Sequence, residues 1–127
     1  MILRNTRTGS LLAERVERAS TALARLRGLL GRRALPEGEA LLIEPCASIH
    51  TFFMRFPIDA VFLSPDLRVV RALAGLRPWR ATTFHRRAAM VVELPAGTVS
   101  RTATREGDVL ELVEGFQASS RTPGAAI

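Results

Sequence analysis

Cys46, His50 and Met54 are the residues whose types and spacing first suggest chemistry, because they recur at every fourth position. On a β-strand, residues four apart point to the same face of the sheet. A thiolate, an imidazole and a thioether on one face would form a ligand set suited to copper. A metal site at these three residues is therefore one hypothesis. The structural alternative places Met54 in the core and leaves His50 partly buried.

Cys46 and His50 could also act as a nucleophile and its base. A reactive cysteine needs a lowered pKa and a base within hydrogen-bond reach. Four residues along a strand span about 13 Å, so the chain would have to bend between Cys46 and His50 for direct contact. An enzyme that uses this pair, or a pair of carboxylates, stands as an alternative function.

Asp59 and Glu93 each interrupt a run of apolar residues. A buried carboxylate needs a partner, and Arg55 and Arg27 are candidates. Such an ion pair could be purely structural. Alternatively, an arginine beside a concave site would bind a carboxylate or phosphate. We therefore expect a ligand or partner groove near Arg27, His50, Arg55, Asp59 and Glu93.

The basic residues suggest a third function. All 18 of them are arginine, and the formal net charge is +6. A GC-rich genome or phosphate recognition would each explain this preference for arginine. Trp79 and Phe84 are interleaved with the densest group, and basic surfaces with aromatic residues can bind single-stranded nucleic acid. Nucleic acid or another acidic partner is thus an alternative ligand for this group, which comprises Arg71, Arg77, Arg80, Arg86 and Arg87.

Composition and missing motifs exclude several classes of protein. The 127 residues fit one domain, expected over residues 1–117, with a disordered tail over 118–127. Its single cysteine cannot form an internal disulfide, and two histidines cannot make a three-histidine zinc site. No Gly-rich phosphate loop, GxSxG, CxxC or HExxH motif is present. We expect no cofactor, no membrane association and a cytoplasmic location, because no signal segment or long apolar run is visible.

The elements that must position these residues are mostly strands. Apolar runs bounded by turn residues predict strands at residues 2–5, 10–19, 40–43, 49–56, 58–63, 69–73, 89–94 and 109–113. Residues 98–102 alternate weakly, and residues 75–87 are irregular and basic. Leucines at helical spacing predict one amphipathic helix over residues 20–31, capped by Ser20 and ended by Gly31. The expected fold is mainly β (α+β), a compact antiparallel β-sandwich or barrel of about seven short strands with this helix packed on it.

Four motifs in order resemble a known family. They are residues 26–32 (LRGLLGR), 49–63 (IHTFFMRFPIDAVFL), 91–97 (VVELPAG) and 106–108 (EGD). Together they resemble the domain-of-unknown-function 192 family over about residues 3–112. The resemblance implies a mainly β sandwich or barrel with a short helix, and it implies no established reaction, cofactor or partner. Arg55 and Phe56 stand where many relatives carry Lys-Asn.

The leading hypothesis from the sequence is a non-enzymatic binding domain for a small ligand or a partner. It rests on polar residues placed inside apolar segments of a chain without a catalytic triad. The sequence does not identify the ligand or the oligomeric state.

Overall fold

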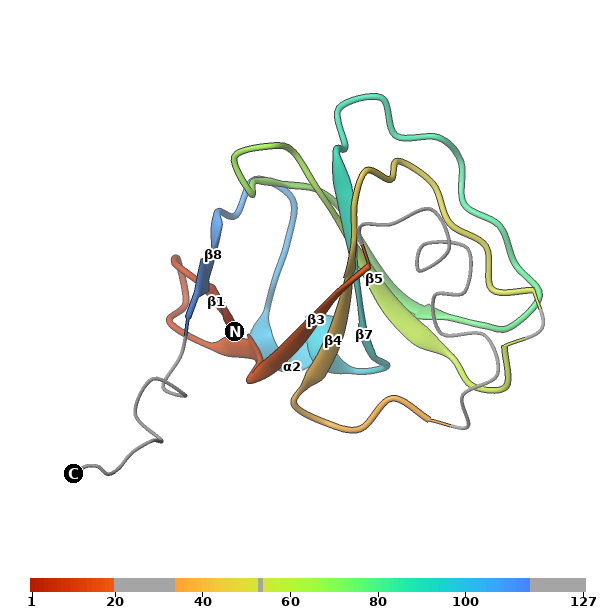
Figure 1. Cartoon of the computed structure of the whole chain (residues 1–127), viewed down its shortest axis with the longest axis horizontal. Helices are drawn as coiled ribbons and strands as arrows, with labels where there is room; N and C mark the ends of the chain where they lie inside the picture. The colour runs from red at the N-terminus through yellow and green to blue at the C-terminus, as the bar shows by residue number, and fades with distance from the viewer. Residues whose placement is uncertain (20–33, 53, 115–127) are drawn as a thin grey trace.

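The computed structural model describes residues 1–19, 34–52 and 54–114 of the chain. Within them, eight strands and one short helix form a two-sheet domain (Figure 1). In chain order they are β1 (Ile2–Asn5), β2 (Leu11–Ala13), β3 (Arg15–Ala19), β4 (Glu39–Ile43), β5 (Ile58–Leu63), β6 (Val69–Leu76), β7 (Met90–Pro95), α2 (Thr98–Thr102) and β8 (Leu110–Val113).

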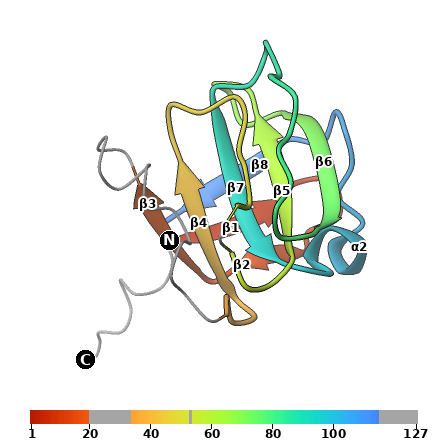
Figure 2. The same ribbon diagram turned by 90° about the vertical axis from the view of Figure 1, so that its right-hand side faces the viewer.

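The strands divide into a small and a large sheet. The small sheet has the order β2-β1-β8, and the large sheet has the order β3-β4-β7-β5-β6 (Figure 2). All neighbours pair antiparallel except β3 and β4, which run parallel from Arg15↔Glu39 to Ala19↔Ile43. Because β3 leaves the hairpin of β1 and β2 to join the large sheet, it connects the two layers.

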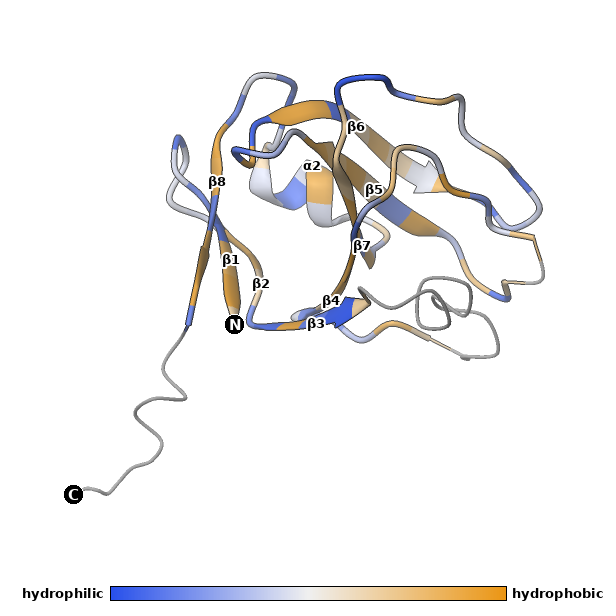
Figure 3. Cartoon of the chain, turned by 45° about the horizontal axis from the view of Figure 1, so that its top comes forward, coloured by the Kyte–Doolittle hydropathy of each residue, from blue (hydrophilic) through white to orange (hydrophobic). Residues whose placement is uncertain are grey.

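Two hydrophobic cores lie on the two faces of the large sheet. One core fills the space between the sheets, where Leu3 and Leu12 of the small sheet meet Val61 and Val92 of the large one. The other core lies on the outer face and includes Phe62. Strands β5 and β7 are therefore buried on both faces, which explains their continuous apolar sequences. Figure 3 shows the resulting concentration of hydrophobic residues on these strands.

The outer face of the large sheet is covered by two irregular segments, residues 44–57 and 77–89 (Figures 1 and 2). They run antiparallel and are joined by backbone hydrogen bonds from Cys46 N to Ala89 O (3.0 Å) and from Thr82 N to Ile49 O (2.9 Å). We call these two segments, apart from residue 53, the outer ribbon. The outer ribbon forms a third layer over the core that contains Phe62.

The structure confirms a mainly β fold in two sheets, and these sheets do not close into a barrel. The expected strand at residues 58–63 is confirmed. A strand over residues 49–56 is wrong, because that segment bonds to the irregular segment 77–89 and has only the isolated bridge His50↔Ala81. The weak alternation at residues 98–102 belongs to helix α2. The expectation of an antiparallel sheet fails at the pair β3–β4.

The predicted helix over residues 20–31 and the tail over 118–127 lie outside the described residues. In the part of the chain that the structure does describe, no helix has the length and apolar character needed to cross a membrane.

Phe62 and Phe84 provide a matched test of this fold. Phe62 is fully buried in the outer core, whereas Phe84 is 69% exposed. We expect Phe62→Ala to lower the free energy of unfolding by about 3–5 kcal/mol, because it leaves a cavity. Phe84→Ala should change it by no more than about 0.5 kcal/mol. Urea denaturation measures both, and equal effects would contradict the fold.

Candidate functional site

Thr51 organises the outer ribbon from inside. Its fully buried side chain donates a hydrogen bond to Arg77 O (2.6 Å) and accepts one from Arg80 N (2.8 Å). Its backbone N–H donates to Arg80 O (2.7 Å), and its carbonyl accepts from Trp79 N (2.9 Å) and Met54 N (3.1 Å). Thr51 therefore joins the two segments at Arg77, Trp79 and Arg80, and the bonds of Ile49 and Cys46 continue the pairing toward Ala89.

Three aromatic rings lie next to one another near Thr51, on the exposed side of the outer ribbon. His50 stacks on Phe52 with a centroid distance of 5.0 Å, and Phe52 lies 6.0 Å from Trp79. Phe52 is 39% exposed and Trp79 is 56% exposed. Trp79 has a left-handed φ of 63°, which is unusual for a residue with a side chain. We call His50, Phe52 and Trp79 the aromatic row.

Exposed arginines lie on the same two segments as the aromatic row. All five are exposed, and none forms an ion pair with a carboxylate within the described residues; they are Arg55, Arg77, Arg80, Arg86 and Arg87. Apart from Glu44, which pairs with Arg18, the outer ribbon carries no acidic residue. The outer ribbon is therefore a positively charged surface that also exposes aromatic rings.

Arg71 is separate from this group, although the sequence suggested one continuous basic patch. It lies on β6 and pairs with Glu106 at 3.7 Å. Arg87 reaches toward the same region, where it lines a shallow groove of about 240 Å³ with Arg68 and Glu106. The unpaired positive charge thus belongs to the outer ribbon rather than to β6.

The three proposed metal ligands take different positions. Met54 is buried in the outer core, whereas His50 is exposed in the aromatic row, so these two side chains lie on opposite sides of the outer ribbon. Cys46 is partly buried and its thiol donates to Ser48 O (3.0 Å). The strand geometry on which the metal hypothesis depends is absent at these positions. No group of three His, Cys, Asp or Glu residues suited to a metal occurs in the described residues.

Asp59 is fully buried, and in the described part of the chain its partners are backbone N–H groups. Its Oδ1 accepts from Gly75 N (2.8 Å), and its Oδ2 accepts from Gly97 N (3.1 Å) and Val99 N (2.7 Å). Gly97 is the N-cap of α2 and has a φ of 98°, which favours glycine. Of the arginines expected to pair with Asp59, Arg55 is exposed and Arg27 lies outside the described residues; the three backbone hydrogen bonds of Asp59 fix α2 and the end of β6.

Glu93 does not form a carboxylate pair with Asp59. Asp59 is opposite Leu94, a residue of the core between the sheets, whereas Glu93 is opposite Ala60, a residue of the outer core. The two carboxylates therefore lie on opposite faces of the large sheet. Glu93 is buried beneath the layer that contains the outer ribbon. Of the expected groove residues that the structure describes, His50 and Arg55 are exposed on the outer ribbon, whereas Asp59 and Glu93 are buried; Arg27 lies outside the described residues.

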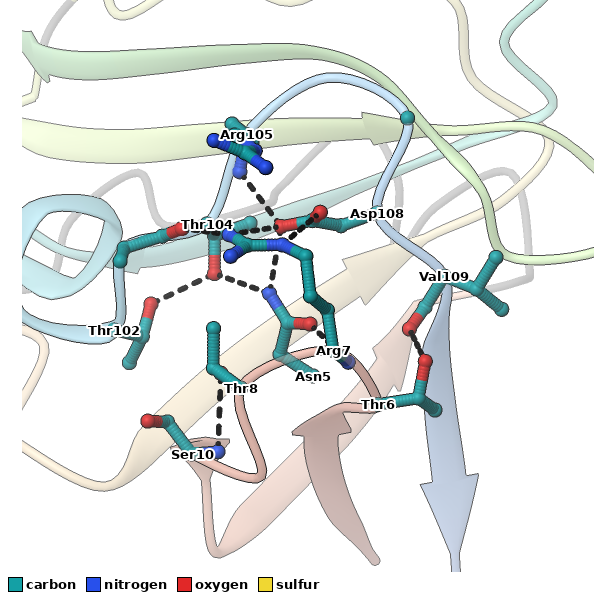
Figure 4. A network of polar contacts seen from close by, with 12 residues as sticks. Asn5, Thr6, Arg7, Thr8, Ser10, Thr102, Thr104, Arg105, Asp108 and Val109 are labelled. Atoms are coloured by element: carbon teal, nitrogen blue, oxygen red, sulfur yellow. Dashed lines mark hydrogen bonds and ion pairs between the residues drawn. The ribbon is translucent and has the colours of Figure 1, made fainter.

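A second polar network joins the small sheet to the loop after α2 (Figure 4). Asp108 accepts from Arg7 Nε (2.6 Å), Asn5 Nδ2 (2.9 Å) and Arg105 N (3.0 Å). The Arg7 guanidinium, helped by Asn5 and Arg105, holds the pKa of the Asp108 carboxyl well below its usual range. Asn5 also donates to Thr104 Oγ1 (3.2 Å). No local pattern predicts this network, because Asn5 and Arg7 are about 100 positions from Asp108 in the chain.

These features define a two-sheet β-domain whose exposed chemistry lies on the outer ribbon and whose buried carboxylates support the scaffold. The sequence profile of the domain-of-unknown-function 192 family, described as an uncharacterized ACR, matches residues 3–112. The chain belongs to this family.

Relatives and solved structures agree with this assignment. The UPF0127 protein of Pyrococcus furiosus is 33% identical over 112 residues, which are 84% of this chain and 94% of the relative. The UPF0127 protein of Thermococcus kodakarensis is 31% identical over 114 residues, 87% of this chain and 71% of the relative.

Two crystal structures share the fold. A protein of unknown function from Novosphingobium aromaticivorans has a TM-score of 0.75 at 24% identity, covering 87% of this chain and 82% of that one. A putative transcription regulator from Sinorhizobium meliloti has a TM-score of 0.74 at 25% identity, covering 87% and 89%.

The contribution of Asp59 to stability can be tested by replacing one of its two carboxylate oxygens with an amide nitrogen. In Asp59→Asn an amide N–H₂ would face backbone donors, so we expect the free energy of unfolding to fall by about 2 kcal/mol or more. Asp66→Asn, at an exposed turn position, serves as the control and should change it by no more than about 0.5 kcal/mol. Chemical denaturation followed by circular dichroism compares them. A stable Asp59→Asn protein would refute the structural role of Asp59.

Asp108 predicts an acid-sensitive contribution to stability. The folded-state pKa is lower than that of the unfolded chain, so the stabilisation is present above about pH 4 and is lost as the pH falls below it. We expect the difference in unfolding free energy between wild type and Asp108→Asn to be constant above about pH 5 and to shrink toward pH 2. Denaturation at a series of pH values measures this difference. A difference that does not change with pH would count against the ion pair.

Proposed function

We propose that the protein is a non-enzymatic binding domain and that the exposed side of the outer ribbon is its binding surface for an anionic macromolecule. One observation carries the proposal: the two segments that expose the aromatic row also carry five exposed arginines without a carboxylate partner in the described residues. Elsewhere in the described chain most arginines, such as Arg4, Arg7 and Arg15, have acidic partners. Arg68 and Arg105 are the exceptions among the described arginines, and they lie in separate turns rather than in a group.

Unpaired surface arginines have a physical consequence. Without nearby carboxylates their charges add, so the surface attracts anionic ligands and concentrates them. Guanidinium groups bind phosphate and carboxylate oxygens in a fixed planar geometry. A polyanion would also release its condensed counterions on binding, which adds affinity at low salt.

A binding role fits the buried groups better than a catalytic one. Asp59 already accepts three hydrogen bonds and lies on the opposite face of the large sheet from Glu93. The thiol of Cys46 donates to a carbonyl, and His50 accepts from Phe52 N (3.3 Å) within its own turn. We therefore propose that the chain needs no cofactor, and we expect it to act in the cytoplasm. The description of the Sinorhizobium meliloti protein as a putative transcription regulator is compatible with an anionic partner.

Chromatography on a heparin matrix tests the proposed function. The double variant Arg77→Gln, Arg80→Gln should elute at a clearly lower salt concentration than wild type, because it removes two unpaired charges beside Trp79. The double variant Arg15→Gln, Arg105→Gln changes the net charge equally but lies outside the outer ribbon.

If the binding surface is the outer ribbon, the control elutes close to wild type. Equal shifts for both double variants would mean that heparin senses only net charge, and the proposed surface would be wrong.

A further inference from the structure

We infer that the ligand of the outer ribbon is single-stranded nucleic acid, with its bases on the exposed aromatic rings and its phosphates at the arginines. This inference rests on the proposed function and names its ligand class. It uses both kinds of side chain that the outer ribbon exposes, and neither kind alone would be sufficient.

The exposed rings are the first line of argument. Phe52, Trp79 and Phe84 are three of the five large hydrophobic residues that are exposed within the described chain, and all three lie on the outer ribbon. The left-handed backbone of Trp79 is held by its hydrogen bond to Thr51 O, so the fold sets the backbone position from which the indole extends. Exposed flat rings in fixed positions are the feature on which unpaired bases stack.

The combination of rings and charges narrows the class of ligand. An acidic peptide would use the arginines and leave the rings without a function, and a neutral sugar would use the rings and leave the arginines without one. A nucleotide chain places one flat base and one phosphate in every repeat. It therefore engages Trp79 and Arg80, which are adjacent in sequence, with a single repeating unit.

A single strand fits this surface better than a duplex. Bases in a duplex are stacked on each other, so their faces cannot reach protein rings, and sequence is read by an element inserted in the major groove. Helix α2 is the single helix in the described residues and has five residues. It is fixed by Asp59 and lies on the side of the large sheet that faces the small sheet, away from the outer ribbon (Figure 1). The outer ribbon is irregular and offers rings at its surface rather than a protruding helix.

The length of the surface sets the size of the site. Arg80 and Arg87 are seven positions apart, a distance of at most about 25 Å in a fully extended chain. Phe84 lies between these two ends of the segment. We expect an occluded site of about four nucleotides, at the lower end of the range for small single-strand binding domains.

Trp79 is the sole tryptophan of the chain, so its fluorescence reports directly on the aromatic row. We expect a twelve-residue oligothymidine to quench this fluorescence with saturation and to bind more tightly than the duplex of the same length. Inorganic polyphosphate, which has the charge but no bases, should bind without comparable quenching. A duplex that binds as tightly as the oligothymidine would overturn the inference.

Ring variants separate stacking from charge. Phe52→Ala should weaken oligothymidine binding by about 5- to 150-fold and leave polyphosphate binding unchanged, because each stacked base depends on its ring. Leu11→Ala is the matched control, since Leu11 is 38% exposed on β2 and Phe52 is 39% exposed. His50→Ala supplies a second ring variant if Phe52→Ala fails to fold by circular dichroism.

The two proposals can fail separately. If the wild-type protein binds neither heparin nor oligothymidine, the proposed function itself is wrong. Heparin binding that depends on Arg77 and Arg80, without quenching by oligothymidine and without an effect of Phe52→Ala or His50→Ala, would overturn this inference alone. That second outcome would identify an acidic protein or a membrane surface as the ligand to examine next.

Discussion

The carboxylate of Asp59 is the point at which three parts of the chain meet. Burying an ionised carboxylate is costly unless it is fully hydrogen-bonded, and here three backbone N–H groups supply those bonds. They come from Gly75 near the end of β6, from Gly97 after β7, and from Val99 in α2. Asp59 in β5 thus fixes both the last residues of β6, the edge strand of the large sheet, and the start of α2. Shorter or neutral side chains cannot offer two acceptor oxygens at this position.

The same constraint positions the outer ribbon. One of its segments ends where β5 begins, and the other starts where β6 ends. These points are paired with each other as Ile58↔Leu76, next to the bond between Asp59 and Gly75. From this fixed end the two segments run back across the outer core, and Thr51 joins them midway. The exposed rings and arginines therefore stand on a scaffold whose geometry is determined by buried polar groups.

The sequence predicted the parts of the fold that depend on local pattern. Strands β5 and β7 are buried on both faces, so their apolar runs were visible. Helix α2 was not, because it has five residues and is stabilised by a carboxylate about 40 positions away. Residues 49–52 alternate in burial as a strand does, but they bond to the segment 77–89 through irregular contacts such as those of Thr51 rather than through a ladder. The alternation of arginines with Trp79 along the chain was enough to predict a basic surface with an exposed ring. The contact of Trp79 with Phe52, which stacks on His50, could not be predicted, because it depends on the pairing of two distant segments.

The small sheet has a consequence for the order of folding. Strands β3 to β7 and the outer ribbon lie within residues 15–95, so the large sheet can assemble before the rest of the chain is made. Strand β1 pairs with β8 from Ile2↔Val113 to Asn5↔Leu110, a separation of more than 100 residues. Contacts of such long range are slow to form, because a large loop must close first. Strand β1 can pair early with its neighbour β2, but the small sheet over the apolar face is complete only after β8 has been made.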